Sequence, residues 1–160
     1  MVVVVVEDEA IIAYCSAAML EEAGHVVLGP AHTSGDALEL VRKRRPEVAV
    51  IDIDLEVPGA GIGLARHLRS HFGTTIVFAT GRADMARAHA DTAAAVLTKP
   101  YDPAELANVV EYAYSLRKQT IRALLHPADG TVEGSRRGCS GKRSRAEVEK
   151  RDDVVLRAQS

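Results

Sequence analysis

The sequence predicts a single α/β domain, a doubly wound parallel sheet of five strands with five helices. Five short aliphatic runs alternate along the chain with longer stretches in which apolar residues recur at helical spacing. The aliphatic runs are nearly continuous rather than alternating, which is typical of strands buried on both faces of a parallel sheet. Strands that alternate with helices in this way favour the doubly wound class.

Each predicted strand is one of these aliphatic runs, and the five runs cover residues 2–6, 26–29, 48–51, 75–79 and 95–98. The first four helices are predicted between them, at residues 10–23, 34–45, 62–72 and 83–90. The fourth helix is the least marked, because it is rich in alanine and only weakly periodic. The glycine-rich stretch 59–63 resembles a nucleotide loop but lacks the fingerprint spacing, so we predict a mobile loop there.

The fifth helix has the clearest start. Asp102 can cap its N-terminus, Pro103 suits the first helical position, and Glu105 completes a capping box. The predicted inward stripe of this helix consists of Leu106, Val109, Val110 and Ala113.

The helical pattern stops near His126, and Gly, Ser and Arg dominate residues 130–145. We therefore predict a domain over residues 1–122 and a C-terminal extension over residues 123–160, largely a disordered basic and polar tail. The charge balance supports this division. Residues 1–126 carry 12 basic and 16 acidic side chains, whereas residues 127–160 carry 8 basic and 6 acidic ones.

The composition argues against several classes of protein. A formal net charge of -2 does not point to nucleic acid or to an anionic membrane surface. The two cysteines, Cys15 and Cys139, suggest neither a disulfide framework nor a zinc motif. The apolar run 2–6 is too short for a membrane span or a signal peptide. We therefore expect a cytoplasmic protein with no membrane partner.

Chemically distinctive residues follow four of the five predicted strands. They are Glu7-Asp8 after the first strand, Asp52 and then Asp54 after the third, Thr80-Gly81 after the fourth, and Lys99-Pro100 after the fifth. Because parallel strands end at the same edge of a sheet, we expect these side chains to converge there.

Three carboxylates near one point need a compensating charge. Two unit charges about 4 Å apart repel by roughly 4 kcal/mol at an effective dielectric constant near 20. Mg²⁺, which prefers a few oxygen ligands and several waters, would relieve this repulsion. A carboxylate beside Mg²⁺ can attack phosphorus, while Lys99 and the Thr80 hydroxyl stabilise the phosphoryl oxygens. The cluster therefore predicts a metal site that also receives an anion.

In this order and on these elements, the residues resemble the signature of bacterial two-component receiver domains. The resemblance covers roughly residues 1–120 and implies the strand order 2-1-3-4-5. It also implies that Asp52 is the phosphoacceptor, that Thr80 and Lys99 hold the phosphoryl group, and that Mg²⁺ is the cofactor. The metal ligands would be Glu7, Asp8, Asp52 and the backbone carbonyl of Asp54.

The same resemblance implies partners and a role. The phosphoryl donor would be a sensor histidine kinase or a histidine phosphotransfer protein, and a downstream protein would receive the signal. A dimer that forms on phosphorylation is a further expectation. The chain would be a switch with only its own phosphorylation and dephosphorylation as reactions, not an enzyme.

Three features depart from the usual receiver pattern. Residues 78–81, Phe-Ala-Thr-Gly, look like the motif of the FATGUY subgroup of stand-alone receivers, but Arg82 follows instead of an aromatic residue. Val96 stands where receivers carry an aromatic switch residue, three positions before the lysine. The loop after Asp52 is glycine-rich and irregular in length.

The sequence bears on two other functions. Asp52, Asp54, Thr80 and Lys99 also echo Mg²⁺-dependent phosphatases of the haloacid dehalogenase type, with Asp52 as nucleophile. The acidic pair of residues 7 and 8, however, lies on an earlier strand than that family requires. Specific DNA binding is not expected, because the basic residues of the tail have no recognition helix beside them.

Overall fold

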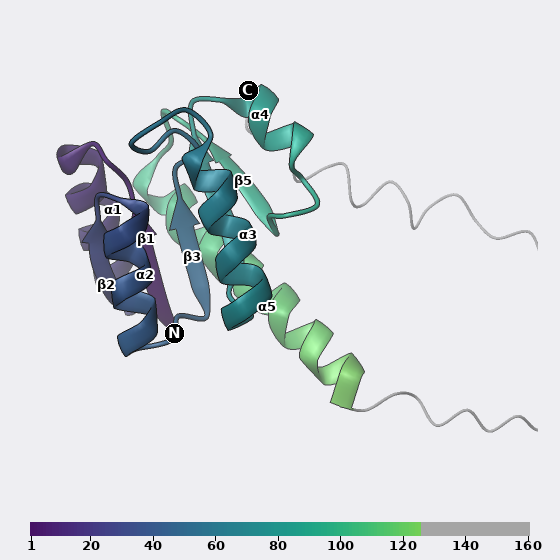
Figure 1. Cartoon of the computed structure of the whole chain (residues 1–160). Helices are drawn as coiled ribbons and strands as arrows, with labels where there is room; N and C mark the ends of the chain where they lie inside the picture. Colours follow the sequence, from purple (N-terminus) through teal and green to yellow (C-terminus); the bar gives the residue numbers. More distant parts are fainter. Residues whose placement is uncertain (126–160) are drawn as a thin grey trace, which may run out of the picture.

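The computed structural model describes residues 1–125, which form one five-stranded parallel sheet with helices on both faces (Figure 1). The strands are β1 (Val2–Val6), β2 (Val26–Ala31), β3 (Val48–Ile51), β4 (Thr75–Thr80) and β5 (Ala95–Thr98). The helices are α1 (Ala10–Glu22), α2 (Ser34–Lys43), α3 (Ala60–Phe72), α4 (Ala83–Ala88) and α5 (Pro103–Leu125). The strand order is β2-β1-β3-β4-β5, which confirms the predicted fold class and topology.

Successive residues of the central strands point to opposite faces of the sheet. In β1, Val3 and Val5 pack with α1 and α5, whereas Val4 and Val6 pack with α2 and α3. All four side chains are at most 1% exposed. This two-sided burial explains why the strands are continuous aliphatic runs in the sequence.

Strand β2 is two residues longer than predicted, because Gly29 lies within it. The register with β1 shifts between Val4 and Val6, and Gly29 adopts a positive φ of 103° at this irregularity. The strand then resumes, with Ala31 paired to Val6. The predicted end at residue 29 is therefore two residues too early, because the strand continues past this bulge.

Helix α3 starts at Ala60, two residues earlier than predicted, so the prediction of a loop over residues 59–63 is wrong for most of that stretch. Gly59 precedes the helix with a φ of 81°. Helices α1, α2 and α4 each end one or two residues before their predicted ends.

Helix α5 begins as predicted and continues to Leu125, three residues past the predicted domain boundary. The Asp102 carboxylate accepts a hydrogen bond of 2.8 Å from the backbone N–H of Ala104. Leu106, Val110 and Ala113 are completely buried, and Val109 packs beside them. The last turns of α5 extend beyond the sheet (Figure 1). Residues 123–125 of the predicted extension 123–160 therefore belong to α5, and the rest of it lies outside the described residues.

Within residues 1–125, no helix is both long enough and apolar enough to cross a membrane.

Candidate functional site

The carboxyl ends of β1 and β3 bring three carboxylates together at one edge of the sheet. Oxygen atoms of Glu7, Asp8 and Asp52 all lie within 4.8 Å of one another. Glu7 and Asp52 are buried, while Asp8 is exposed at the rim. The adjacent strands β1 and β3 end in register, with Val6 beside Ile51, so the residues that follow them meet as the sequence predicts.

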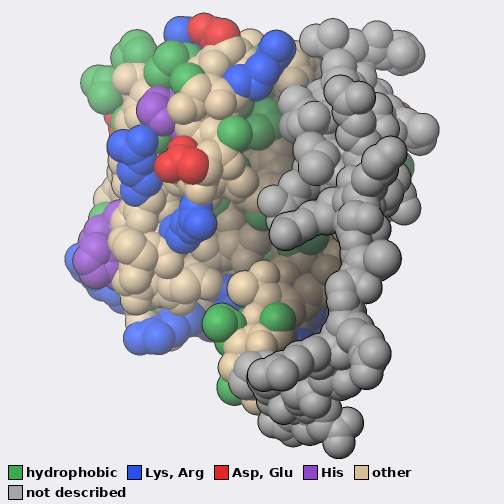
Figure 2. All heavy atoms as spheres, turned by 90° about the vertical axis from the view of Figure 1, so that its right-hand side faces the viewer, with side chains coloured by type: hydrophobic (Ala, Val, Ile, Leu, Met, Phe, Trp, Pro, Cys, Tyr) green, Lys and Arg blue, Asp and Glu red, His purple; other side chains and the backbone are tan. Residues whose placement is uncertain are grey.

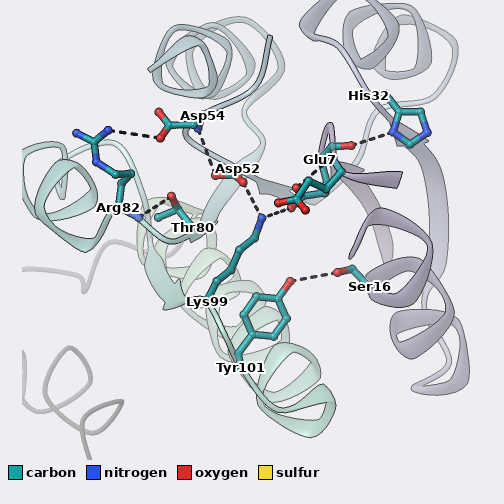
Figure 3. A network of polar contacts seen from close by, with 10 residues as sticks. Glu7, Ser16, His32, Asp52, Asp54, Thr80, Arg82, Lys99 and Tyr101 are labelled. Atoms are coloured by element: carbon teal, nitrogen blue, oxygen red, sulfur yellow. Dashed lines mark hydrogen bonds and ion pairs between the residues drawn. The ribbon is translucent and has the colours of Figure 1, made fainter. Parts of the chain in front are cut away.

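Lys99 reaches this cluster from the end of β5 (Figure 3). Its Nζ atom lies 2.5 Å from Glu7 Oε2 and 2.6 Å from Asp52 Oδ2, and it donates a hydrogen bond to each. The three side chains are at most 16% exposed. One ammonium group therefore serves two buried carboxylates at once.

The pKa values of this network follow from burial and charge. Burial raises the pKa of Glu7 above its ordinary value, and the hydrogen bond and charge of Lys99 offset only part of this rise. Burial alone would lower the pKa of Lys99, but hydrogen bonds and charges from Asp52 and Glu7 outweigh it and raise that pKa. Lys99 thus stays charged at neutral pH, and the cluster keeps an excess of negative charge.

Asp54 links the acidic cluster to the loop before α3. Its backbone N–H donates a 3.2 Å hydrogen bond to Asp52 Oδ1, and its carboxylate accepts one of 3.0 Å from the backbone of Gly59. The Asp54 carboxylate also lies 3.5 Å from the guanidinium group of Arg82. The predicted role of the Asp54 carbonyl as a metal ligand stays a prediction.

Thr80 belongs to the same network but is completely buried at the end of β4. Its Oγ1 accepts a 3.1 Å hydrogen bond from the backbone N–H of Arg82. The Arg82 side chain is about half exposed and points toward Asp54 (Figure 3). Its Nε atom also lies 3.4 Å from the Asp84 carboxylate. Arg82 stands where the FATGUY subgroup has an aromatic residue. It therefore places a positive charge beside the acidic cluster, which an aromatic side chain would not do.

Sequence reasoning did not single out His32, Tyr101 or Gly61. His32 Nδ1 donates a 2.9 Å hydrogen bond to the carbonyl of Glu7, because the longer β2 ends beside β1. The Tyr101 hydroxyl lies 3.1 Å from Ser16 Oγ, and its position two residues after Lys99 was the available signal. Burial raises the pKa of Tyr101.

Gly61 packs directly against the backbone of Asp52. A Cβ atom at residue 61 would lie 1.9 Å from the carbonyl oxygen of Asp52, which is far inside van der Waals contact. The backbone N–H of Gly61 donates a 3.0 Å hydrogen bond to the carbonyl of Ile53. Only glycine allows helix α3 to approach the end of β3 this closely.

The donor set fits a small divalent cation. All three side chains offer carboxylate oxygens, the ligand type that Mg²⁺ prefers, and the exposed Asp8 leaves one side open to water. The excess negative charge beside a single lysine gives such a cation a favourable place.

The sequence profile of the response regulator receiver domain matches residues 3–111 of the chain. The chain is 27% identical over 128 residues to the phyllosphere-induced regulator PhyR of Methylorubrum extorquens, covering 79% of this chain and 48% of that protein. It is 33% identical over 125 residues to the transcriptional regulatory protein PdtaR of Mycobacterium tuberculosis, covering 76% of this chain and 60% of that one.

Among solved structures, the response regulator PhyR from Brucella abortus superimposes with a TM-score of 0.68 at 25% identity, over 79% of this chain and 52% of that chain. A receiver domain protein from Clostridium thermocellum has a TM-score of 0.66 at 22% identity, over 74% of this chain and 98% of that one. The latter likeness supports the fold alone. The chain spans about half the length of PhyR and 60% of that of PdtaR.

Proposed function

Because this chain belongs to the family of response regulator receiver domains, we propose that Asp52 accepts a phosphoryl group in a Mg²⁺-dependent reaction. Membership of this family makes the chain a receiver of phosphorelay signalling, a switch rather than an enzyme. The observation that carries the proposal is the contact of Lys99 with both Asp52 and Glu7 at the edge where β1, β3 and β5 end. The comparisons give no support to the alternative prediction of a phosphatase.

Asp52 is the nucleophile in this proposal. One of its oxygens forms a bond to phosphorus as the bond between phosphorus and the donor's imidazole nitrogen breaks, and that nitrogen keeps the electron pair. Asp52 needs no general base, because an ionised carboxylate has no proton to lose. The hydrogen bond from the Asp54 backbone N–H to Oδ1 holds the carboxylate group in place.

The neighbouring residues stabilise the phosphoryl oxygens. Lys99 already lies 2.6 Å from Asp52, so a small shift lets it pair with a phosphoryl oxygen instead. Thr80 can donate its hydroxyl proton to another oxygen, since Oγ1 only accepts its bond from Arg82. Mg²⁺, held by Glu7, Asp8, Asp52 and the carbonyl of Asp54, would neutralise charge on the phosphoryl group.

A protein donor is supported by the first helix. Ile11 and Tyr14 share one face of α1, a few residues after the acidic cluster, and are 81% and 62% exposed. Large apolar side chains with this exposure suit a protein contact next to the site. A histidine kinase or a histidine phosphotransfer protein would dock there with its phosphohistidine over Asp52.

The downstream partner is proposed to be a protein. A related structure is described as the anti-anti-sigma factor PhyR from Bartonella quintana. That structure is 24% identical in sequence to this chain, which supports a shared fold and not a shared target. The protein that this chain contacts must be found by experiment. The likeness to the FATGUY subgroup, the cytoplasmic location and dimerisation on phosphorylation stay predictions.

Intact-mass spectrometry after incubation with acetyl phosphate tests the acceptor. We expect one phosphoryl adduct that requires Mg²⁺, is removed by hydroxylamine and is absent from Asp52→Asn. Asp84→Asn is the matched control, because it removes an exposed carboxylate outside the cluster and should keep the adduct. An adduct of equal yield on Asp52→Asn would contradict the proposal.

A further inference from the structure

A groove of about 500 Å³ lies at the opposite edge of the sheet from the acidic cluster, where β4 and β5 begin. Figure 2 shows the side of the molecule that carries β5, the edge strand, where blue Lys and Arg side chains predominate over red acidic ones. We name this feature the α3–α5 groove, after the two helices on its sides. Its apolar lining residues are Ile76, Ala93, Ala94, Leu116 and Ile121.

Two arginines border the groove without an acidic partner. Arg69 of α3 donates a hydrogen bond to the carbonyl of Asp91. Arg117 of α5 donates to the carbonyls of Gly73 and Glu47. Neither guanidinium forms an ion pair with a carboxylate among residues 1–125.

Backbone carbonyls orient the two arginines, and no carboxylate of residues 1–125 lies within ion-pair distance of either guanidinium. Asp91 contributes the one carboxylate among the residues that line the groove. The groove therefore fits a segment that combines two acidic side chains with a short aliphatic run.

We propose that residues 152–156 of this same chain dock in the α3–α5 groove. Their sequence is Asp-Asp-Val-Val-Leu, and no other place in residues 126–160 has two acidic residues directly before three aliphatic ones. Asp152 and Asp153 would face Arg69 and Arg117, and the three aliphatic side chains would cover the apolar lining.

The connection is long enough for this contact. Helix α5 ends at Leu125, one turn after Ile121 in the groove, and residues 126–151 lie between it and the segment. A chain of that length can span up to roughly 90 Å, which far exceeds what is needed. Tethering gives an effective concentration of millimolar order, so even a weak site would be occupied. Any protein that binds this groove would have to displace the segment.

Paramagnetic relaxation enhancement in the full-length chain tests the contact. A nitroxide is attached at Arg157→Cys in a chain with Cys15→Ser and Cys139→Ser, and amide spectra are compared before and after reduction of the nitroxide. We expect the amides of Thr75, Ile76 and Thr92 to lose most of their intensity. Amides at the acidic cluster, at the other edge of the sheet, should keep theirs.

Charge-reversed variants make the test specific. Asp152→Lys/Asp153→Lys should abolish the broadening, whereas Glu147→Lys/Glu149→Lys makes the same change in charge a few residues earlier and should leave it intact. Adding Arg69→Glu/Arg117→Glu to the first variant should restore it. A native-like amide spectrum of that combined variant confirms that it folds.

Two results would overturn the proposal. One is the absence of broadening in the groove, or equal broadening after reversal of Asp152 and Asp153. The other is broadening of the groove amides on ¹⁵N-labelled chains that carry no nitroxide themselves, when these chains are mixed with unlabelled chains that carry it. That result would assign the groove to a segment of a second copy.

Discussion

At the scale of single residues, Lys99 joins the two buried carboxylates of the acidic cluster. Its Nζ atom lies 2.5 Å from Glu7 and 2.6 Å from Asp52, so it balances two carboxylates that would otherwise repel at close range. The sequence could predict this convergence, because the parallel topology alone brings the strand ends to one edge. It could not predict that Lys99 contacts both carboxylates, because this depends on side-chain conformation in the folded chain.

Lys99→Met should destabilise the fold when metal is absent. Removing one partner of a buried ion pair leaves uncompensated charge and costs about 3–5 kcal/mol, and less where, as here, some water reaches the site. Urea unfolding in EDTA measures the change in the free energy of unfolding. Lys43→Met, at an exposed lysine of α2, is the control and should change little. Mg²⁺ should stabilise Lys99→Met more than the native chain. Equal unfolding curves for the native chain and Lys99→Met would show that Lys99 does not hold the cluster together.

Glu7 should make stability fall as pH rises. Its pKa is raised in the folded chain, mainly by burial, so the folded state holds this proton more tightly than the unfolded state. The free energy of unfolding therefore decreases as pH rises from the ordinary glutamate value of about 4.3 through the raised pKa. Glu7→Gln lacks this titration.

The measurement is the free energy of unfolding in EDTA at several pH values. The free energy of unfolding of the native chain minus that of Glu7→Gln should fall as pH rises through the titration of Glu7. Above that pH range the difference should be constant. Glu9→Gln is the control, because it changes an exposed neighbouring carboxylate that Lys99 does not contact. A difference that rises with pH would show that the Glu7 pKa is lowered instead.

At the scale of elements, two glycines lie at two of the boundary errors in the sequence prediction, the end of β2 and the start of α3. The aliphatic runs located all five strands; β1, β3 and β4 are almost wholly buried, whereas the edge strands β2 and β5 are only partly buried. The sequence pattern ends the second strand at Gly29 and predicts a loop around Gly61, whereas Gly29 lies within β2 and Gly61 within α3. Their roles depend on what lies beside them in space, the bulge against β1 and the carbonyl of Asp52. No local pattern carries that information.

Gly61→Ala should lower both the stability of the fold and the rate at which Asp52 is phosphorylated. Its Cβ would lie 1.9 Å from the carbonyl oxygen of Asp52, so the start of α3 or the end of β3 must move. We expect a loss of about 1–3 kcal/mol, the usual range for overpacking, together with slower labelling by acetyl phosphate.

Gly63→Ala is the matched control in the same helix. Nothing lies within 4 Å of a Cβ at residue 63, and alanine is the better helix former. This variant should be as stable as the native chain or more stable, by up to about 1 kcal/mol. If the two variants unfolded alike, the close approach of Gly61 to Asp52 would have no energetic role.

In the whole molecule, charge is separated between the two edges of the sheet. The carboxyl edge carries Glu7, Asp8 and Asp52. Helices run opposite to the strands, so the last turns of α2 and α3, with Arg42, Lys43 and Arg69, lie at the other edge. Cations at helix C-termini are favourable there. This arrangement favours a cation at the acidic edge and acidic groups at the opposite edge.

Mg²⁺ should therefore stabilise the molecule globally and not only near the site. Glu7 and Asp8 follow β1, Asp52 follows β3, and Lys99 follows β5, so the cluster depends on nearly the whole sheet being formed. A ligand that binds only the folded state, at a free concentration of 100 times its Kd, adds about 2.7 kcal/mol to the free energy of unfolding.

Native-state hydrogen exchange should show this gain at central amides such as those of Val4 and Val50. The exposed last turns of α5 should not show it, because opening there is local. In Asp8→Asn, Mg²⁺ should add much less to the free energy of unfolding. If Mg²⁺ slowed exchange only at amides next to the cluster, metal binding would not be coupled to global unfolding.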